Sequence, residues 1–459
     1  MSVKTVIFLS LILDLFAFTI PLPLFPRIVE WYTQREAHDK TGLLSRSLQA
    51  VSFLRSFFRS SKLDTKRWDV VLLGGFMGSL FSALQFLVSP HIGSLSDKYG
   101  RKPVLLVTMI GNILSALIWV QSTSWSSYLL SRAVGGLSEG NVQLAIAILS
   151  DVTPAETRSR SLALVGLAFS ICFCIGPPIG AYFSMHPFQF QSYLREGWEL
   201  NIYATPALVT LVLLVVETLF LAFALPETRA RVTSEAIQST EKDAKASKKP
   251  SATKGNPVLS RLHRLSVLKQ ARGMHFNFLL AFSGVEFTLT FLTYDLFDWN
   301  NAKNGRLLAI VGIMSALLQG GYTRTATRKI GEGVMARRGM ISCAISFLLL
   351  ASLPSLDAIW APRVIYVAAA FLAFTSATVV SSLTALASLQ CDDDASTSEG
   401  SALAKGKALG QFRSSGQLGR AIGPLLSCAM YWTFGPSVTY STAAAAMMAL
   451  AVSMRQLTK

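Results

Sequence analysis

The sequence predicts an all-α membrane protein whose chain crosses the bilayer twelve times as helices. The composition is 51% hydrophobic but only 15% charged, whereas a soluble domain carries about 25% charged residues. Apolar runs, each close to the roughly 17–25 residues that a bilayer core requires, recur along the whole chain. These two observations exclude the alternative of several soluble domains, which a length of 459 residues would otherwise permit.

The individual spans follow from the positions of the apolar runs. We expect helices at residues 5–28, 70–91, 104–121, 126–150, 161–184, 203–225, 274–297, 306–322, 339–355, 362–388, 409–432 and 437–454. The first run resembles a signal peptide in its apolarity. However, it carries Asp14 at its centre and three prolines at its end, so we interpret it as a span that is not cleaved.

The middle of the chain divides the spans into two groups of six. Residues 229–272 include a polar, Lys-rich run without apolar periodicity, which predicts a flexible cytosolic linker. The sequence therefore predicts an N-terminal six-span half at 1–228 and a C-terminal six-span half at 273–459.

The distribution of charge indicates how the spans are oriented. If both termini are cytosolic, the cytosolic segments hold roughly twice as many Lys and Arg as the opposite side. The net charge of +16 is thus explained by topology, and no nucleic-acid partner is expected. Nothing in the sequence distinguishes the plasma membrane from an organelle membrane. Within the long 29–69 loop, residues 42–63 fit either an amphipathic interfacial helix or an ordered cap on the bundle.

The five cysteines do not form the pattern of a disulfide framework. Four lie within apolar runs and Cys391 lies in a loop, so we interpret them as small core residues. No metal site and no cofactor are expected.

The sharpest motif lies between the second and third expected spans, at Gly93, Asp97, Gly100, Arg101 and Lys102. Two helices must reverse there within about ten residues, and the two glycines permit close approach and a turn. Asp97 can accept from a helix N-terminus or pair with a cation, which would form a clamp that opens on rearrangement. An ordinary tight loop with a positive-inside bias is the alternative interpretation.

The stretch Gly93-Ser-Leu-Ser-Asp97-Lys-Tyr-Gly100-Arg101-Lys102 resembles the loop signature of the major facilitator superfamily. The resemblance implies the twelve-span major facilitator fold with two pseudo-symmetric six-helix halves. It also implies secondary active transport of a small solute by alternating access. A shift of 227 residues places a fainter copy of the motif at Gly320, Arg328 and Lys329.

The expected fourth span carries Arg132 together with Gly135, Gly136 and Gly140. An arginine inside a span costs about 3 kcal/mol unless it faces water or a partner. Glu139 could be that partner, and a purely structural ion pair is the alternative. The motif resembles the fourth-span motif of the superfamily, which implies a role for Arg132 in substrate or proton handling.

The expected fifth span contains Gly176, Pro177, Pro178 and Gly180, a combination that bends a helix and permits close contact. It resembles the antiporter motif of the superfamily. The alternative is a kink that any rocking bundle needs.

Further charges lie inside the expected spans, and the fold implied by the resemblance places several of them along a central cavity. The candidate substrate and proton pathway comprises Asp14, Arg132, Glu139, Glu286, Arg413 and Arg420. We hypothesise that Asp14 or Glu286 carries a proton, with pairing to Arg132 as the structural alternative.

Three stretches resemble one branch of the superfamily, the eukaryotic tetracycline transporter-like (TETRAN) organic anion transporters. These stretches are 282–297, 135–142 and 413–424. The resemblance implies a small-molecule substrate, an organic anion or drug-like molecule. We expect a monomeric carrier in the lipid bilayer, and the fifth-span motif favours proton-coupled antiport over uniport or symport. The chain contains no phosphate-binding loop, zinc signature or nucleophile elbow, so an enzyme is not expected. A receptor or scaffold that shares the fold without transporting is the remaining alternative.

Overall fold

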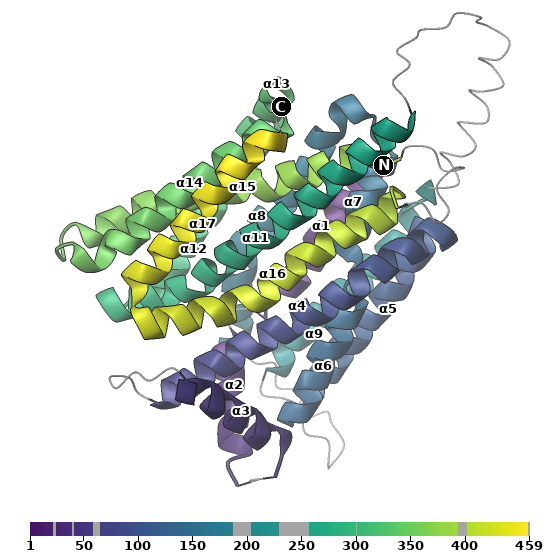
Figure 1. Ribbon diagram of the computed structural model, residues 1–459. Helices are drawn as coiled ribbons and strands as arrows, with labels where there is room; N and C mark the ends of the chain where they lie inside the picture. Colours follow the sequence, from purple (N-terminus) through teal and green to yellow (C-terminus); the bar gives the residue numbers. More distant parts are fainter. Residues whose placement is uncertain are drawn as a thin grey trace, which may run out of the picture.

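The computed structural model describes residues 1–21, 24–38, 41–57, 65–186, 203–228, 257–299, 301–392 and 402–457, and these residues fold into a bundle of helices (Figure 1). The first half contains α1 (Val3–Thr19), α2 (Phe25–Arg35), α3 (Leu43–Phe57), α4 (Thr65–Tyr99), α5 (Arg101–Val120), α6 (Trp125–Ser138), α7 (Asn141–Asp151), α8 (Ala155–Met185) and α9 (Ala204–Ala224).

The second half contains α11 (Pro257–Phe297), α12 (Asn301–Leu317), the π-helix η3 (Leu318–Thr323), α13 (Arg324–Ile330), α14 (Glu332–Ser352), the short 3-10 turn η4 (Leu353–Ser355), α15 (Ala361–Leu389), α16 (Lys405–Phe434) and α17 (Pro436–Leu457). Each expected span coincides with one of these helices or with consecutive pieces of helix. The all-helical fold class predicted from the sequence is confirmed.

Two spans are broken where the sequence analysis expected continuous helices. The first ends at Thr19 and resumes as α2 at Phe25, because prolines in between interrupt the backbone hydrogen bonds. The fourth is split into α6 and α7 at Glu139, whose backbone is extended (φ −70°, ψ 98°). Irregular backbone at this depth is tolerated where protein or a water-filled cavity surrounds it, so this break marks the interior of the bundle.

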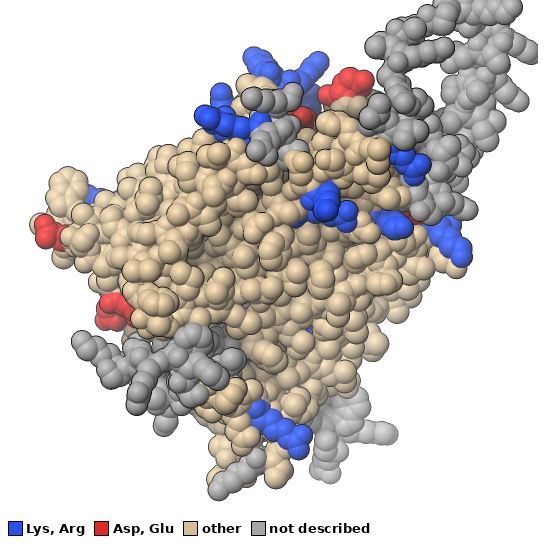
Figure 2. All heavy atoms as spheres, in the orientation of Figure 1, with Lys and Arg blue, Asp and Glu red and all other residues tan. Residues whose placement is uncertain are grey.

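The outer surface matches a lipid environment. Among the described residues, eight helices are long and apolar enough to cross a membrane by length and composition. Figure 2 shows a broad face without charged side chains, with Lys and Arg gathered mainly along the edge that carries the chain termini. Apolar side chains such as Val107, Ile110 and Phe223 are exposed on helix surfaces, as expected where acyl chains replace water.

Both chain termini lie at the same end of the bundle, together with the turn between α4 and α5 (Figure 1). We call this the clamp end, and the opposite end, where α2 and α3 lie, the far end. α3 packs onto the far end through Leu44, which is 3% exposed, while Phe53 is 64% exposed. The expected helix within 42–63 therefore forms over 43–57, with one face on the bundle.

The expected linker at 229–272 differs from the structure at its second end. α11 already begins at Pro257, so residues 257–272 extend a helix of 41 residues rather than belonging to a flexible segment. A proline at the first helical position is pre-organised for helix formation. The remaining linker residues, 229–256, lie outside the described part of the chain.

The internal repeat is real, but its alignment differs from the expected shift of 227 residues. Gly100 precedes α5 with φ +97° and ψ 161°, and Gly331 precedes α14 with φ +83° and ψ 155°. Gly331 therefore corresponds to Gly100, and the sequence alignment was one helical turn out of register. The π-helix η3 precedes this turn and changes the helical register there, which distinguishes the second half from the first at this point.

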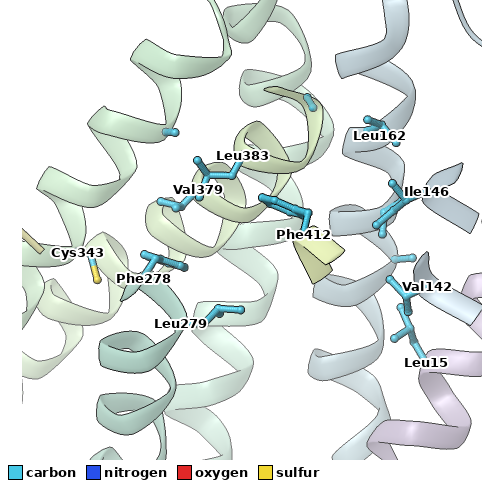
Figure 3. Packing of buried hydrophobic residues seen from close by; sticks show 14 of the residues in the cluster. Leu15, Val142, Ile146, Leu162, Phe278, Leu279, Cys343, Val379, Leu383 and Phe412 are labelled. Atoms are coloured by element: carbon cyan, nitrogen blue, oxygen red, sulfur yellow. The ribbon is translucent and has the colours of Figure 1, made fainter. Parts of the chain in front are cut away.

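Apolar side chains of both halves pack into one continuous core (Figure 3). Leu15, Val142 and Ile146 of the first half and Leu279 and Val379 of the second belong to it. Phe412 of α16 lies between the two groups in this view. The two halves are thus in direct apolar contact.

Candidate functional site

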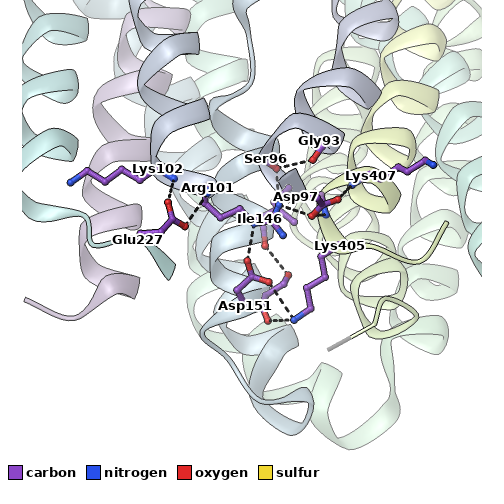
Figure 4. Close-up of polar contacts among 12 residues, drawn as sticks. Gly93, Ser96, Asp97, Arg101, Lys102, Ile146, Asp151, Glu227, Lys405 and Lys407 are labelled. Atoms are coloured by element: carbon purple, nitrogen blue, oxygen red, sulfur yellow. Dashed lines mark hydrogen bonds and ion pairs between the residues drawn. The ribbon is translucent and has the colours of Figure 1, made fainter. Parts of the chain in front are cut away.

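Asp97, near the end of α4, joins the two halves at the clamp end (Figure 4). Its carboxylate accepts from the backbone N–H groups of Gly406 at 2.9 Å and Lys407 at 2.7 Å, in the first turn of α16. The first N–H groups of a helix have no partner within it and carry the positive end of the helix dipole. A carboxylate from one half therefore caps a helix of the other.

Arg101 holds this carboxylate in place. Its Nη1 donates to Asp97 at 2.8 Å and its Nε donates to Asp151 at 2.8 Å. Lys405 of the second half lies 3.4 Å from the other Asp151 oxygen. Arg101 is only 2% exposed and Asp97 6%. Charges at this depth require such pairing, because an isolated buried charge is strongly destabilising.

The turn between α4 and α5 has its own hydrogen-bonded support. Glu227, after α9, accepts from the backbone N–H groups of Arg101 and Lys102, both at 3.0 Å. The Lys102 ammonium donates to the Ala222 carbonyl at 2.7 Å. Gly100 adopts φ +97°, a conformation that other residues rarely reach. Asp97, Arg101 and Lys102 thus belong to one hydrogen-bonded network around this turn.

Close approach of α4 and α16 makes the clamp geometrically possible. A Cβ atom at Gly93 would overlap the carbonyl of Gly406. At Gly410 it would lie 2.6 Å from the carbonyl oxygen of Ser89. Small residues on both helices therefore allow backbone to meet backbone.

Further bridges between the halves follow at the same end. Ser388 of α15 donates to Ser150 of α7 at 2.8 Å, and Arg158 of α8 donates to the Ser388 carbonyl at 3.3 Å. Ser159 donates to Glu332 at the start of α14. The halves are therefore closed against each other at the clamp end.

A group of charged side chains lies deeper in the bundle, around the break between α6 and α7. Asp14 of α1 is buried and accepts from Asn141 of α7 at 2.6 Å. Glu139, at the break, lies within electrostatic range of both Asp14 and Arg413. Arg413 comes from α16 in the other half and acts on both carboxyl groups. The structure therefore brings these three predicted residues together across the interface.

A second pair of interacting charges, Arg420 and Glu286, lies further along α16. Arg413, Gln417 and Arg420 are spaced at i, i+4 and i+7, so they share one helix face. Arg420 acts electrostatically on Glu286 of α11. Glu286 is exposed although it lies within a predicted span, and both arginines are half-buried. Because Arg413 faces carboxyl groups of the opposite half, we interpret this accessible face as the wall of an interior passage.

Arg132 has a different environment from the one expected. Its guanidinium lies 5.7 Å from the ring centres of both Trp119 and Tyr128, in a cation–π arrangement. The described residues give it no salt bridge, and the expected partner Glu139 interacts with Arg413 instead. The break after Ser138 turns Glu139 away from the helical course that the sequence implied.

The fifth-span motif lies within α8, where both Pro177 and Pro178 are inside the helix. A Cβ atom at Gly176 would overlap the Thr19 side chain, and one at Gly180 would overlap the carbonyl of Ile20. The two glycines therefore allow α8 to pack directly against the end of α1.

Sequence reasoning did not assign several residues that complete the network. Asp151, Glu227 and Lys405 were not predicted as clamp residues, and Asn141 was not predicted as the partner of Asp14. The signal for the first two was a pair of charged segments directly after spans, at 151–160 and 226–228. Among the described residues, no group of three or more His, Cys, Asp or Glu side chains could hold a metal ion.

Comparisons with known proteins agree with this architecture. The model of the Major Facilitator Superfamily matches residues 7–424. Major facilitator superfamily domain-containing protein 10 from human is 32% identical over 96% of this chain and 90% of its own length, and that from mouse is 31% identical over 96% and 89%. The class C tetracycline resistance protein of Escherichia coli is 27% identical over 60% of this chain and 63% of its own.

A solved structure is similar over almost the whole fold. The crystal structure of the human organic anion transporter MFSD10 (TETRAN) superposes with a TM-score of 0.79 at 30% identity, covering 98% of each chain. Sequence, clamp motif and fold therefore lead to one conclusion: the chain belongs to the major facilitator superfamily of membrane transporters.

Proposed function

We propose that this protein carries a small organic anion across the membrane by alternating access, with both termini and the clamp end in the cytosol. The observation that carries the proposal is the electrostatic interaction of Arg413 with Asp14 and Glu139 across the two halves. Arginines that are costly to place within a membrane, and that line a shared interior, mark a substrate path by default.

The sign of the substrate charge follows from these arginines. Arg413 and Arg420 lie on one face of α16 and are half-buried. A planar guanidinium binds carboxylate, sulfonate or phosphate groups in a bidentate manner. The name of the human relative, an organic anion transporter, supports the same substrate class.

Arg132 was predicted as a residue of the substrate and proton pathway, but we propose a different role for it. Its contacts with Trp119 and Tyr128 favour a role in stabilising the wall of the first half rather than in binding substrate. The clamp residues are proposed as the conformational gate, and the glycines and prolines of α8 as the packing joint between α8 and α1.

Proton coupling is proposed through the carboxyl groups that share Arg413, with Glu286 as a further carrier beside Arg420. A substrate anion and an ionised carboxylate compete for the same guanidinium. Protonation of Asp14 or Glu139 would release Arg413 for the anion, so anion and proton would then move together. The fifth-span motif, which resembles the antiporter motif of the superfamily, favours antiport instead, so the sign of the pH gradient that drives uptake decides between the two.

Flux measurements in proteoliposomes test the proposal. We expect uptake of a panel of organic anions that depends on a pH gradient, and loss of uptake in Arg413→Gln and Arg420→Gln. Arg132→Gln serves as the comparison, with lower thermal stability but an unchanged KM. Uptake driven by an acidic outside shows co-transport, and uptake driven by an acidic inside shows exchange.

Two results of these flux measurements would contradict the proposal. Equal uptake in Arg413→Gln and in the unmodified protein would exclude the assigned anion site. Binding of the same anions without any flux would instead support a receptor or scaffold.

A further inference from the structure

Glu217 is a charged residue in an unusually apolar helix. It is the single Asp, Glu, Lys or Arg of α9, whose mean hydropathy is 2.5, the highest value among the candidate spans of the described chain. Its side chain is 0% exposed. A charged side chain within a span costs about 3 kcal/mol, so its presence requires an explanation.

Glu217 points into the protein and not into lipid. Thr210, Leu214 and Leu221 lie at i−7, i−3 and i+4 and are all buried. On the other side of the helix, Val216 is 48% and Leu219 54% exposed. The carboxyl group therefore belongs to the interior of the first half.

Its contacts do not provide a positive charge. Ser10 of α1 donates to Glu217 Oε1 at 2.8 Å, and Oε2 has no hydrogen-bond partner among the described residues. The charged groups that act on it are Asp14 of α1 and Glu139 at the α6–α7 break. An ionised Glu217 would thus be held by one hydroxyl and repelled by two acidic groups.

The helices packed around α9 supply no compensating cation among the described residues. From α5, the Asn112 amide lies near Glu139, and Lys102 donates to the Ala222 carbonyl at the clamp end of α9. From α8, the Cys172 thiol lies near Asp14. Arg413 acts on Asp14 and Glu139 from the other half.

From this geometry we propose that Glu217 is a second proton-binding site, which stores a proton beside the passage and exchanges it with Asp14. The inference rests on the proposed proton coupling and extends it to a residue outside the passage. In the closed form the proton is bound to Glu217 Oε2, the oxygen that has no hydrogen-bond partner in the described part of the chain.

The exchange follows from the position of Arg413. It belongs to the second half, whereas all three carboxyl groups belong to the first. When the halves part at the clamp end, Arg413 withdraws and an ionised Asp14 loses its compensating charge. The proton then moves from Glu217 to Asp14, so that one O–H bond breaks, another forms and the total charge is unchanged. Ser10, one turn before Asp14 on α1, donates to Glu217 Oε1 and so links that helix to the carboxyl group that releases the proton.

Infrared difference spectroscopy tests the proton on Glu217 without any need for transport. A protonated carboxyl shows a C=O stretching band that an ionised carboxylate lacks. We expect this band in the purified full-length protein and its loss in Glu217→Gln, which keeps the shape and the Ser10 hydrogen bond. Thr210→Val is the matched control, because it removes a different buried polar group from the same face of α9 and should leave the band intact.

Transport measurements test the exchange. The ratio of uptake with and without a pH gradient should fall toward one in Glu217→Gln, with KM at a fixed acidic pH unchanged. Glu217→Asp, which keeps a carboxyl group, should restore part of the pH dependence. It also provides the test if the glutamine variant does not fold.

The outcomes separate this inference from the proposed function. A wild-type band and pH profile in Glu217→Gln would overturn the inference while leaving proton-coupled transport in place. If uptake by the unmodified protein does not depend on pH, the proposed proton coupling is overturned. In that case the infrared band still reports whether Glu217 holds a proton.

Discussion

A single carboxylate at the clamp end stabilises one conformation of the whole protein. Asp97 accepts from Arg101 of its own half and from two backbone N–H groups at the start of α16. Hydrogen bonds to a charged group are worth about 1.5–3 kcal/mol each. Those to α16 exist only while the halves are closed at this end, so they shift the equilibrium toward that form.

Substitution Asp97→Asn should open the clamp end. Asparagine keeps one acceptor but loses the charge, so we expect a roughly tenfold or larger rise in the opened population if about 1.4 kcal/mol or more is lost. The thiol of Cys391, which follows α15, reports this opening because it is 2% exposed and lies near Lys405 and Asp97. Burial raises the pKa of that thiol to about 12, so it is protonated and unreactive at neutral pH until opening lets water reach it.

The measurement is the rate of maleimide labelling at Cys391, followed by mass spectrometry of each cysteine. Labelling should accelerate at Cys391 and remain slow at Cys343, which is buried within the second half. Equal acceleration at both cysteines would indicate general loosening and would count against a local clamp.

At the scale of helices, the crossing of α4 and α16 depends on the absence of side chains. Gly93, Gly406 and Gly410 leave no room for a Cβ atom at the contact. Sequence inspection gave Gly93 a packing role, but its contact with Gly406 depends on how the two halves dock.

We expect Gly93→Ala to separate the two helices at the clamp end. The added methyl group would overlap the Gly406 carbonyl, and overpacking of this kind costs about 1–3 kcal/mol. The strain is present only while the halves are closed at this end, so the closed form should lose stability relative to the open form. The rate of uptake should change as a result. A fluorescence pair placed on the first turns of α5 and α16 measures the separation.

Gly78→Ala is the control on the same helix, since a Cβ atom there would meet nothing within 4 Å. Alanine also improves intrinsic helix propensity by about 1 kcal/mol over glycine. A similar opening in both variants would show that the effect arises from helix stiffness and not from the crossing.

At the scale of the whole molecule, the proposed alternating access requires the two halves to separate at the clamp end. The hydroxyl oxygens of Ser150 and Ser388 lie 2.8 Å apart across the interface. Cysteines at these positions, in a background without the native cysteines, are close enough to form a disulfide. Oxidation should stop transport, and reduction should restore it.

A matched pair within one half provides the control. The hydroxyl oxygens of Ser115 and Ser131 lie 3.4 Å apart, and both residues belong to the first half. If the halves move as rigid bodies, linking Ser115→Cys to Ser131→Cys should leave transport nearly unchanged. Continued transport with the Ser150–Ser388 positions linked would refute separation at the clamp end.

The fold class and the turn between α4 and α5 follow from local features that need no knowledge of distant contacts. Apolar runs of bilayer length predict spans, and a turn between adjacent spans brings Gly93, Gly100 and Arg101 together within about ten residues. The clustering of basic residues is also local. These features explain why the sequence alone could predict a twelve-span bundle and the residues of the α4–α5 turn.

Only the tertiary structure decided which charges meet. Periodicity gives the direction of a side chain along a continuous helix, but the break between α6 and α7 changes that direction for Glu139. Its partner, Arg413, lies far away in sequence and approaches only because the halves dock. Arg132 consequently packs on aromatic rings, and Glu217 lies beside two other acids, which one-dimensional patterns cannot show.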